Sequence, residues 1–419
     1  MKRRHDWPHG RRRLGSLIVP GLLLFASCAA HAAGPHFALA TTATELFVFR
    51  DQGTWGAKSW SRLLGVNPGS AALAGVAADG SYVYVVDNSA DGKLIVGRVA
   101  DLLGTPTWVE VATVALQSAD GSKKVKSPTR LAPDGRGGVY VIGGSQGANS
   151  YFAYVKPTAG DWALPIVSIG DLPGSVMADV AVGRLGTSAI IAHSKDTPTT
   201  TRASHASKVV EGDVSSTTDL SPLCLNARAV AVVQALGADG YAYVVNYNSD
   251  STRTKGSVRA VDIATGMPRG TQGIELPDMI PEDVTTFAVG QDYYLGIVGH
   301  DAALQRAMVW KVPLSADDWT PLPGSAVSRE LPITTGHQAA ASSDGEVLWY
   351  VSETGAMGVL DTASWTAMAP PVANGWFLGE GIRLENVAEY PPSLIPEPSS
   401  LASLGGLIAA VVSIRRRRR

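Results

Sequence analysis

Between residues 37 and 390 the hydrophobic residues occur in short runs, and small or polar turn residues separate these runs. Valine, tyrosine and phenylalanine dominate the runs, as in Tyr82–Val86, which follows an Asp-Gly turn. Short runs of β-branched and aromatic residues between glycine-containing turns are typical of β-strands. The pattern therefore predicts an all-β domain built from many short strands.

One turn-and-strand unit recurs along this domain. Asp-Gly turns followed by such a strand lie at residues 79, 134, 239 and 344, and weaker copies lie near residues 186 and 291. Successive copies are 52 to 55 residues apart, and a shorter copy, Thr44–Phe49, opens the domain. A unit of about 50 residues with four short strands has the size of a propeller blade, which is buried only when neighbours stack on it. The sequence predicts a β-propeller over residues 34–390 with seven blades, or with six as the alternative.

A tryptophan marks the later part of five units: Trp60, Trp108, Trp162, Trp319 and Trp365. The stretches Val139–Gly144, Tyr154–Pro157 and Val359–Asp361, together with the tryptophans that follow, resemble kelch-type β-propellers. The glycine pair occurs in the third unit alone, so the resemblance implies degenerate kelch-like blades. Val261–Gly266 is closer to a quinoprotein or generic blade.

Ring closure requires strands from the end of the domain, because an open ring leaves unpaired strand edges. The first unit is short and lacks part of a blade. We expect Trp376–Leu378 and Ile382–Val387 to supply the missing strands beside Phe37–Phe49. A loose C-terminal extension is the alternative.

The first 33 residues have the parts of a secretory signal peptide. A basic segment, Lys2–Arg13, precedes an apolar run, Leu14–Ala30, which ends in small residues up to Ala33. This arrangement predicts cleavage after Ala33. A twin-arginine signal around Arg11–Leu14 and a lipoprotein box at Phe25–Cys28 are the alternatives.

The last residues contain three parts in a fixed order. Pro396, Glu397 and Pro398 lie in a proline-rich linker, residues 391–400, and an apolar run, Leu401–Ile414, follows. Five arginines end the chain: Arg415, Arg416, Arg417, Arg418 and Arg419. Basic residues that flank a membrane span are retained on the cytoplasmic side. Residues 401–419 are therefore expected to form a transmembrane helix and an arginine tail.

This tail resembles the PEP-CTERM sorting signal of Gram-negative bacteria. The resemblance implies an exosortase-type membrane protease as partner, transient anchoring in the inner membrane, and release to the cell envelope or the extracellular exopolysaccharide. An ordinary tail anchor is the alternative. A helix over residues 399–414 would be about 24 Å long, which is short for a hydrocarbon core of roughly 30 Å.

Charge and cysteine content narrow the classes of function. The chain has 35 basic and 37 acidic residues; without residues 1–33 and 391–419, 24 basic and 35 acidic residues remain, a formal net charge of −11. Such a body lacks the basic footprint that nucleic-acid binding or docking on anionic lipid requires. If Cys28 leaves with the signal peptide, Cys224 remains alone and forms no internal disulfide.

Polar residues follow the anchor strand of each unit, where we expect them to share one rim of the ring. They are Arg50-Asp51, Asp87-Asn88, Gly143-Gly144, His193-Ser194, Asn246-Tyr247, His300-Asp301 and Ser352-Glu353. That polar residues merely end strands at the water-exposed surface is the alternative.

One of these turns has the beginning of a calcium-binding loop. Asp87, Ser89 and Asp91 offer oxygen ligands at alternate positions, and Gly92 follows. Arg98 lies near the place where an EF-hand has its last acidic ligand, so a metal-free Asx turn is the alternative. Calcium is the one cofactor that the sequence indicates.

No nucleophile elbow, phosphate-binding glycine loop or histidine pair with metal-ligand spacing occurs in the sequence. We therefore expect an exported, non-catalytic propeller of the cell envelope or exopolysaccharide, whose partner is a polysaccharide or an envelope protein. The alternative is a propeller enzyme that acts on extracellular polysaccharide. A glycoside hydrolase would show two carboxylates about 5 to 9.5 Å apart in a deep pocket.

Overall fold

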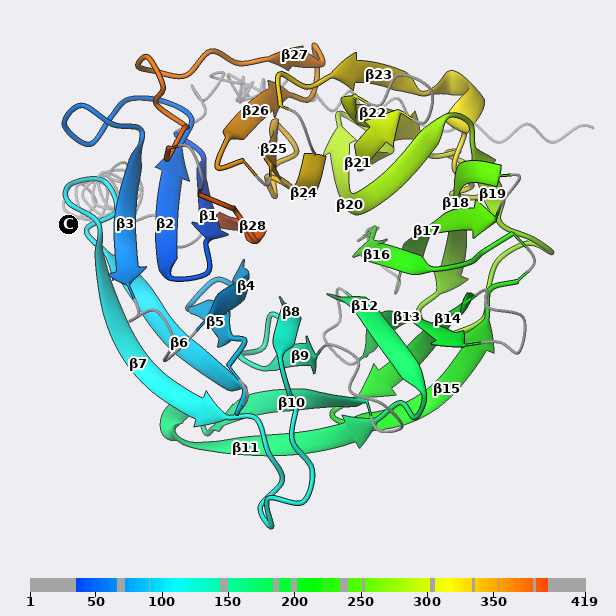
Figure 1. Cartoon of the computed structure of the whole chain (residues 1–419), viewed down its shortest axis with the longest axis horizontal. Coiled ribbons are helices and arrows are strands. Elements are labelled where there is room, and N and C mark those ends of the chain that lie inside the picture. Colours follow the sequence, from blue (N-terminus) through cyan, green and yellow to red (C-terminus); the bar gives the residue numbers. More distant parts are fainter. Residues whose placement is uncertain are drawn as a thin grey trace, which may run out of the picture. The chain divides into compact units, whose positions relative to one another are not determined.

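The computed structural model describes residues 35–390 except for residues 66–71, 90, 144–149, 184–187, 197–201, 222, 234–239, 251–252, 302–305, 334–335, 353 and 380–381. In the described part, 28 strands form seven antiparallel four-stranded sheets around a central channel (Figure 1). The predicted seven-bladed β-propeller is confirmed. One short 3-10 helix, η1 (Pro323–Ser325), accompanies the strands.

The four strands of each blade run in order from the channel to the outer edge. The innermost strands of blades 1 to 7 are β28 (Asn386–Tyr390), β4 (Leu73–Ala78), β8 (Pro128–Pro133), β12 (Ser175–Val182), β16 (Ala227–Val232), β20 (Met279–Val289) and β24 (Gly336–Ala341). The second strands are β1 (Phe37–Thr41), β5 (Val83–Asp87), β9 (Val139–Gly143), β13 (Ala189–Asp196), β17 (Tyr241–Asp250), β21 (Asp292–Asp301) and β25 (Val347–Ser352).

The outer half of each blade completes the sheet. The third strands are β2 (Glu45–Arg50), β6 (Lys93–Ala100), β10 (Tyr151–Thr158), β14 (Arg202–Val210), β18 (Arg253–Asp262), β22 (Ala307–Pro313) and β26 (Met357–Asp361). The outermost strands are β3 (Trp60–Gly65), β7 (Thr107–Ala115), β11 (Asp161–Asp171), β15 (Asp213–Asp219), β19 (Ile274–Leu276), β23 (Val327–Glu330) and β27 (Thr366–Ala367).

The hydrophobic core lies between the blades. Seven clusters of buried side chains fill the seven interfaces between neighbouring blades. Second strands such as β5 and β9 are buried along their whole length, which explains their continuous runs of apolar residues. Burial of both faces requires a neighbour on each side, and this holds the blades in a ring.

The C-terminal strand closes the ring. β28 pairs with β1 in antiparallel register from Phe37↔Tyr390 to Thr41↔Asn386. Closure by the end of the domain is therefore confirmed, although the strand begins at Asn386, later than expected. The expectation that Trp376–Leu378 adds a strand to blade 1 is wrong, because blade 1 consists of β28, β1, β2 and β3, and Phe377 forms an isolated bridge with Ala356 of blade 7 instead.

The repeat anchors at residues 79, 134, 291 and 344 lie in turns between the innermost and second strands, which we call A–B turns. Blade 1 differs because the chain enters it at its second strand. The copy Thr44–Phe49 therefore covers most of β2, the third strand, and no part of a second strand. Strand direction alternates within a blade, so Arg50-Asp51 lies on the opposite face of the ring from Asp87-Asn88. The prediction that these two pairs share one rim is wrong.

The expected signal peptide, linker and tail helix lie in residues 1–34 and 391–419, outside the described residues. Within the part of the chain that is described, no helix has the length and apolar character needed to cross a membrane.

Candidate functional site

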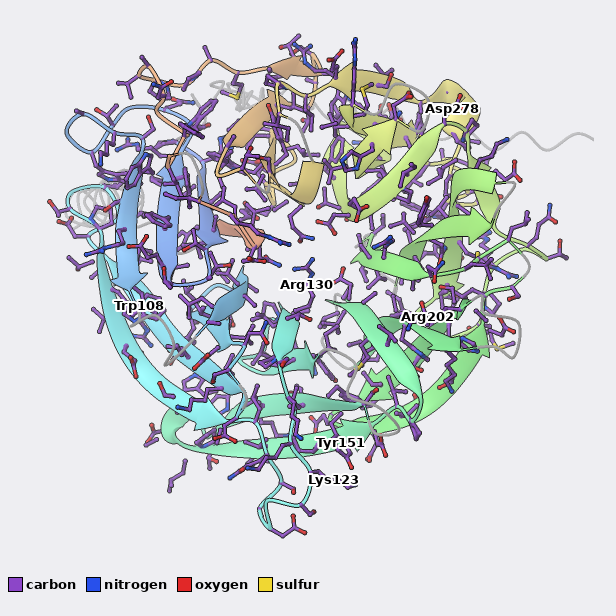
Figure 2. All side chains as sticks on the ribbon, in the orientation of Figure 1. Trp108, Lys123, Arg130, Tyr151, Arg202 and Asp278 are labelled. Carbon is purple, nitrogen blue, oxygen red and sulfur yellow. The ribbon has the colours of Figure 1, made fainter. Side chains whose placement is uncertain are left out.

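Three charged residues line the channel at one structural position. The innermost strands of blades 3, 4 and 6 each contain a β-bulge, and the residues that follow it are Arg130, Asp179 and Asp283. A bulge redirects a side chain, here toward the channel. Arg130 lies near the centre of the ring in Figure 2. We call these three residues the channel site.

The channel site borders a cavity of about 270 Å³. Small residues such as Ala77 and Ala340 form much of its wall, and Gln338 and Asn386 add polar side chains. The Asn386 Nδ2 donates a hydrogen bond to the Gln338 Oε1 at 3.5 Å, across the closure between blades 1 and 7. The cavity is therefore polar at its sides and framed by six of the seven blades.

Backbone amides hold the two carboxylates, and each carboxylate accepts one of these bonds from the next blade. The Val230 N–H donates to the Asp179 Oδ2 at 3.0 Å, and the Val180 N–H donates to its Oδ1 at 2.8 Å. In the same manner the Ala339 N–H donates to the Asp283 Oδ2 at 2.9 Å. Each aspartate thus joins its own blade to the next one along the channel wall.

The surroundings favour the protonated form of these acids. Burial raises the pKa of Asp179, and burial together with the negative charge of Asp179 raises the pKa of Asp283. The guanidinium of Arg130 acts on both carboxyls in the opposite direction. Arg130 therefore faces two acids with raised pKa values, and Glu389, whose pKa burial raises to about 7, lines the same cavity.

Two carboxyls with raised pKa values are also a feature of acid–base catalysis. The size of the cavity argues against that role, because about 270 Å³ is at the lower limit of ligand pockets, which hold roughly 300–1,000 Å³. The hydrogen bonds to the next blade show that both aspartates join neighbouring blades.

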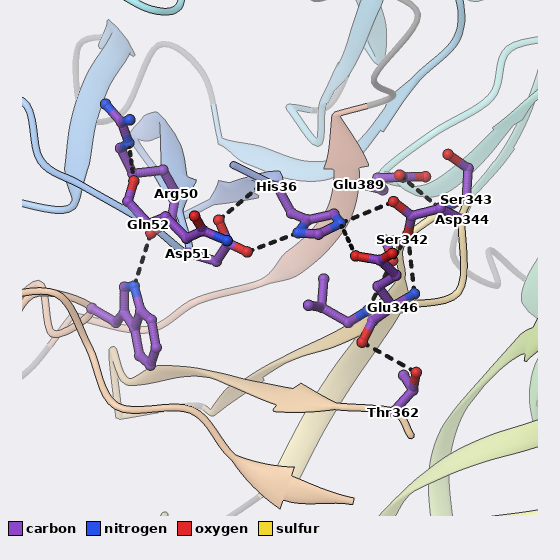
Figure 3. Close-up of polar contacts among 12 residues, drawn as sticks. His36, Arg50, Asp51, Gln52, Ser342, Ser343, Asp344, Glu346, Thr362 and Glu389 are labelled. Carbon is purple, nitrogen blue, oxygen red and sulfur yellow. Dashed lines mark hydrogen bonds and ion pairs between the residues drawn. The ribbon is translucent and has the colours of Figure 1, made fainter. Parts of the chain in front are cut away.

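A second cluster lies where blade 1 meets blade 7 (Figure 3). His36, just before β1, donates its backbone N–H to the Asp51 Oδ1 at 2.7 Å, and its Nδ1 lies 2.7 Å from the Asp51 Oδ2. Its Nε2 lies 2.9 Å from the Asp344 Oδ2 and 3.7 Å from the Glu346 Oε2. We call these four residues the closure site.

His36 carries a proton in this arrangement. Burial alone would lower the pKa of His36, but hydrogen bonds to Asp344 and Asp51 raise it to about 10. Burial would raise the pKa of Asp344, yet the bonds from His36 and Ser342 hold it well below its usual range. The imidazolium therefore joins a carboxylate of blade 1 to one of blade 7.

Those rim residues predicted from sequence that the structure describes are buried or half-buried, so they form no open polar surface. Exposed fractions are 3 % for Asp87 and 0 % for His193, Asn246 and Ser352. Burial and the positive charges of His205 and Lys195 lower the pKa of His193 to about 3. These groups bond to strands of their own blade or the neighbouring one. The His193 Nε2 lies 2.8 Å from the Ser207 Oγ of the same blade, and the Ser204 Oγ of blade 4 donates to the Asn246 Oδ1 of blade 5.

The expected calcium ligands lie in the turn after β5. The Asp87 Oδ1 accepts the N–H groups of Ala72 and Ser89 at 3.0 and 2.9 Å, which is an Asx-turn arrangement. Asp91 lies 3.5 Å from the Lys124 Nζ. Calcium binding by Asp87, Ser89 and Asp91 stays a prediction, and an unchanged melting temperature on adding calcium would reject it.

Sequence reasoning missed both sites. The signal for the channel site was a single charge within small apolar residues, as in Met177–Val182. His36 gave no comparable signal, because its partners Asp344 and Glu346 are about three hundred residues away in the chain. The buried Cys224 has a pKa that burial raises to about 11, as expected of an inert thiol.

No protein-family profile matches the sequence, and no curated protein is significantly similar to it. Among solved structures, the chain is similar to one in "Crystal Structure of Mitotic Checkpoint Complex", with a TM-score of 0.49 and 13% identity over 75% of this chain and 80% of that chain. A likeness at that level carries no argument about function.

Proposed function

We propose that the chain is an exported, non-catalytic propeller that binds or organises polysaccharide in the cell envelope or exopolysaccharide matrix. The observation that carries the non-catalytic part is the channel site. Asp179 and Asp283 accept amide hydrogen bonds from the neighbouring blades, and their cavity is small for a substrate. We therefore assign both acids a role in joining neighbouring blades and no role in a reaction.

The place of the tail supports delivery by an exosortase-type system. β28 ends at Tyr390, so the last strand of the ring is complete before the Pro396-Glu397-Pro398 motif begins. A protease that acts near the motif would leave every strand of the propeller intact. Ala33 likewise precedes His36, the first residue of the closure site.

The formal net charge of −11 on residues 34–390 bears on the ligand. A polyanionic polysaccharide would be repelled at low ionic strength, whereas a neutral one would not. We therefore propose neutral glycans as the preferred class.

The alternative function is hydrolysis of extracellular polysaccharide, and the raised pKa values of Asp179 and Asp283 favour it. A general acid near neutral pH needs such a raised pKa.

A glycan array combined with an assay for new reducing ends separates the two functions. The binding account predicts retention of neutral glycans without release of product. Release of product by the wild type and its loss in Asp179→Asn and Asp283→Asn, but not in the exposed-site control Asp161→Asn, would establish the enzyme instead. If no glycan is bound and no product forms, the polysaccharide proposal is wrong.

A further inference from the structure

The closure site brings one imidazole and two carboxylates to one point. The His36 Nε2 and carboxylate oxygens of Asp344 and Glu346 all lie within 4.8 Å of one another. Asp344 and Glu346 belong to the A–B turn of blade 7, and 39 % and 54 % of their side chains are exposed. Solvent therefore reaches both carboxylates directly, while the Asp344 Oδ1 also accepts from the Ser342 Oγ and the Glu346 N–H.

The opposite side of His36 is fixed. Asp51, whose side chain is fully buried, accepts from both the backbone N–H and the Nδ1 of His36. A carboxylate on one ring nitrogen fixes the tautomer and leaves the other nitrogen as a metal ligand, the usual environment of metal-binding histidines. Asp51 thus orients the ring without being a ligand itself.

We propose that the closure site binds one divalent transition-metal ion through the His36 Nε2, Asp344 and Glu346. The ion takes the place of the proton between His36 and Asp344, and this proton is released to solvent. Ligand atoms around such an ion lie about 3–4 Å apart, so small rotations of the two exposed carboxylates are sufficient.

The set of donor atoms selects the metal. Zinc accepts one imidazole nitrogen and carboxylate oxygens and leaves a further position for water. Manganese accepts the same donors but binds more weakly in the usual order of stability. Calcium takes oxygen ligands and gains little from imidazole. We therefore assign zinc as the preferred ion.

An ion in this position would connect the two ends of the propeller. His36 precedes β1 in blade 1, whereas Asp344 and Glu346 precede β25 in blade 7. The same turn also contacts the closing strand, because the Ser343 N–H donates to the Glu389 Oε1 of β28 at 2.6 Å. The metal would thus stabilise ring closure, whether or not the protein binds polysaccharide.

The test uses the tag-free full chain in mild detergent, treated with a chelator and then titrated with Zn²⁺, Mn²⁺ or Ca²⁺. We expect one retained zinc ion per chain and a melting temperature that rises with zinc concentration, as required of a ligand that binds the folded state. Manganese should give a smaller rise. Co²⁺ should give a visible absorption band that is absent without the imidazole ligand.

The informative variant is Glu346→Gln, because this exposed side chain can be changed without loss of the fold. Zinc affinity should fall at least about tenfold. Glu330→Gln is the matched control, since Glu330 is equally exposed at 54 % and lies on β23. His300→Gln controls for binding to any histidine.

Each remaining outcome overturns the proposal. Failure of the wild type to retain zinc, or equal retention by Glu346→Gln and Glu330→Gln, shows that the cluster is no metal site. A cobalt absorption band that persists in His36→Gln would also show that the cluster is no metal site. None of these results bears on glycan binding, so the two proposals fail separately.

Discussion

Asp79, Asp134 and Asp344 occupy the same turn of three blades and use their carboxylates in related ways. Asp79 and Asp134 accept backbone amides of their own turns and a tyrosine hydroxyl, from Tyr84 and Tyr154, each at 2.7 Å. In Asp344 the histidine of blade 1 takes the place of the tyrosine. At the residue scale, one repeated turn has thus been adapted to close the ring.

The pH dependence of stability is a prediction at this scale. Burial and the charge of Asp179 raise the pKa of Asp283, so the folded state binds this proton more tightly than the unfolded state. The resulting stabilisation is present at low pH and is lost as pH rises through the raised pKa. Arg130 and Glu389 also line the cavity. In Asp283→Asn this contribution disappears.

Denaturant midpoints between about pH 4 and pH 8 provide the measurement. The wild type should lose more stability over this range than Asp283→Asn. Equal slopes in the two proteins would show that Asp283 ionises at its ordinary pH.

At the scale of elements, the tryptophans near the outer edge explain the second landmark of the repeat. Trp162, on β11 of blade 3, contacts Tyr82 and Tyr84 of blade 2, with ring centroids 6.0 and 5.9 Å apart. Trp365 of blade 7 likewise stacks on Phe287 of blade 6 at 6.0 Å. Each tryptophan fills the space between its own blade and the preceding one.

Replacement of Trp162 tests this packing. Trp162→Ala removes a side chain that is 2 % exposed, and we expect a loss of about 3–5 kcal/mol in the free energy of unfolding. Leu164→Ala on the same strand is the control, because Leu164 is 78 % exposed and its loss should cost less than about 0.5 kcal/mol. Similar losses of unfolding free energy in both variants would contradict the packing of Trp162 between blades 2 and 3.

The period of the repeat predicted the number of blades, because turn residues and apolar strands are local signals. These local signals assigned Thr44–Phe49 of blade 1 to the wrong strand position. The chain enters that blade at its second strand, and Thr44–Phe49 resembles an anchor strand in composition alone. The channel aspartates and His36 depend on contacts between strands far apart in sequence, which no local pattern encodes.

At the scale of the whole molecule, the ring is closed by five residues directly before the tail. A chain that stops after Glu385 lacks β28. Strand β1 then has no inner neighbour, and blade 1 has no strand at the channel. We expect the cooperative transition to disappear or the melting temperature to fall by about 10 °C or more. A chain that stops after Tyr390 keeps every strand and should melt like the full chain. Equal melting of the two truncated chains, measured by circular dichroism, would show that β28 is dispensable.

The central proposal is a folded propeller delivered by two removable ends. The most direct measurement is the intact mass of the protein recovered from the matrix fraction of an exosortase-bearing Gram-negative host. The account predicts a chain that begins at Gly34 and lacks Arg415–Arg419, and it predicts retention of the tail in the inner membrane when Pro396 and Pro398 are replaced by alanine. A full-length mass in the cytoplasm, or identical processing of the alanine variant, would contradict it.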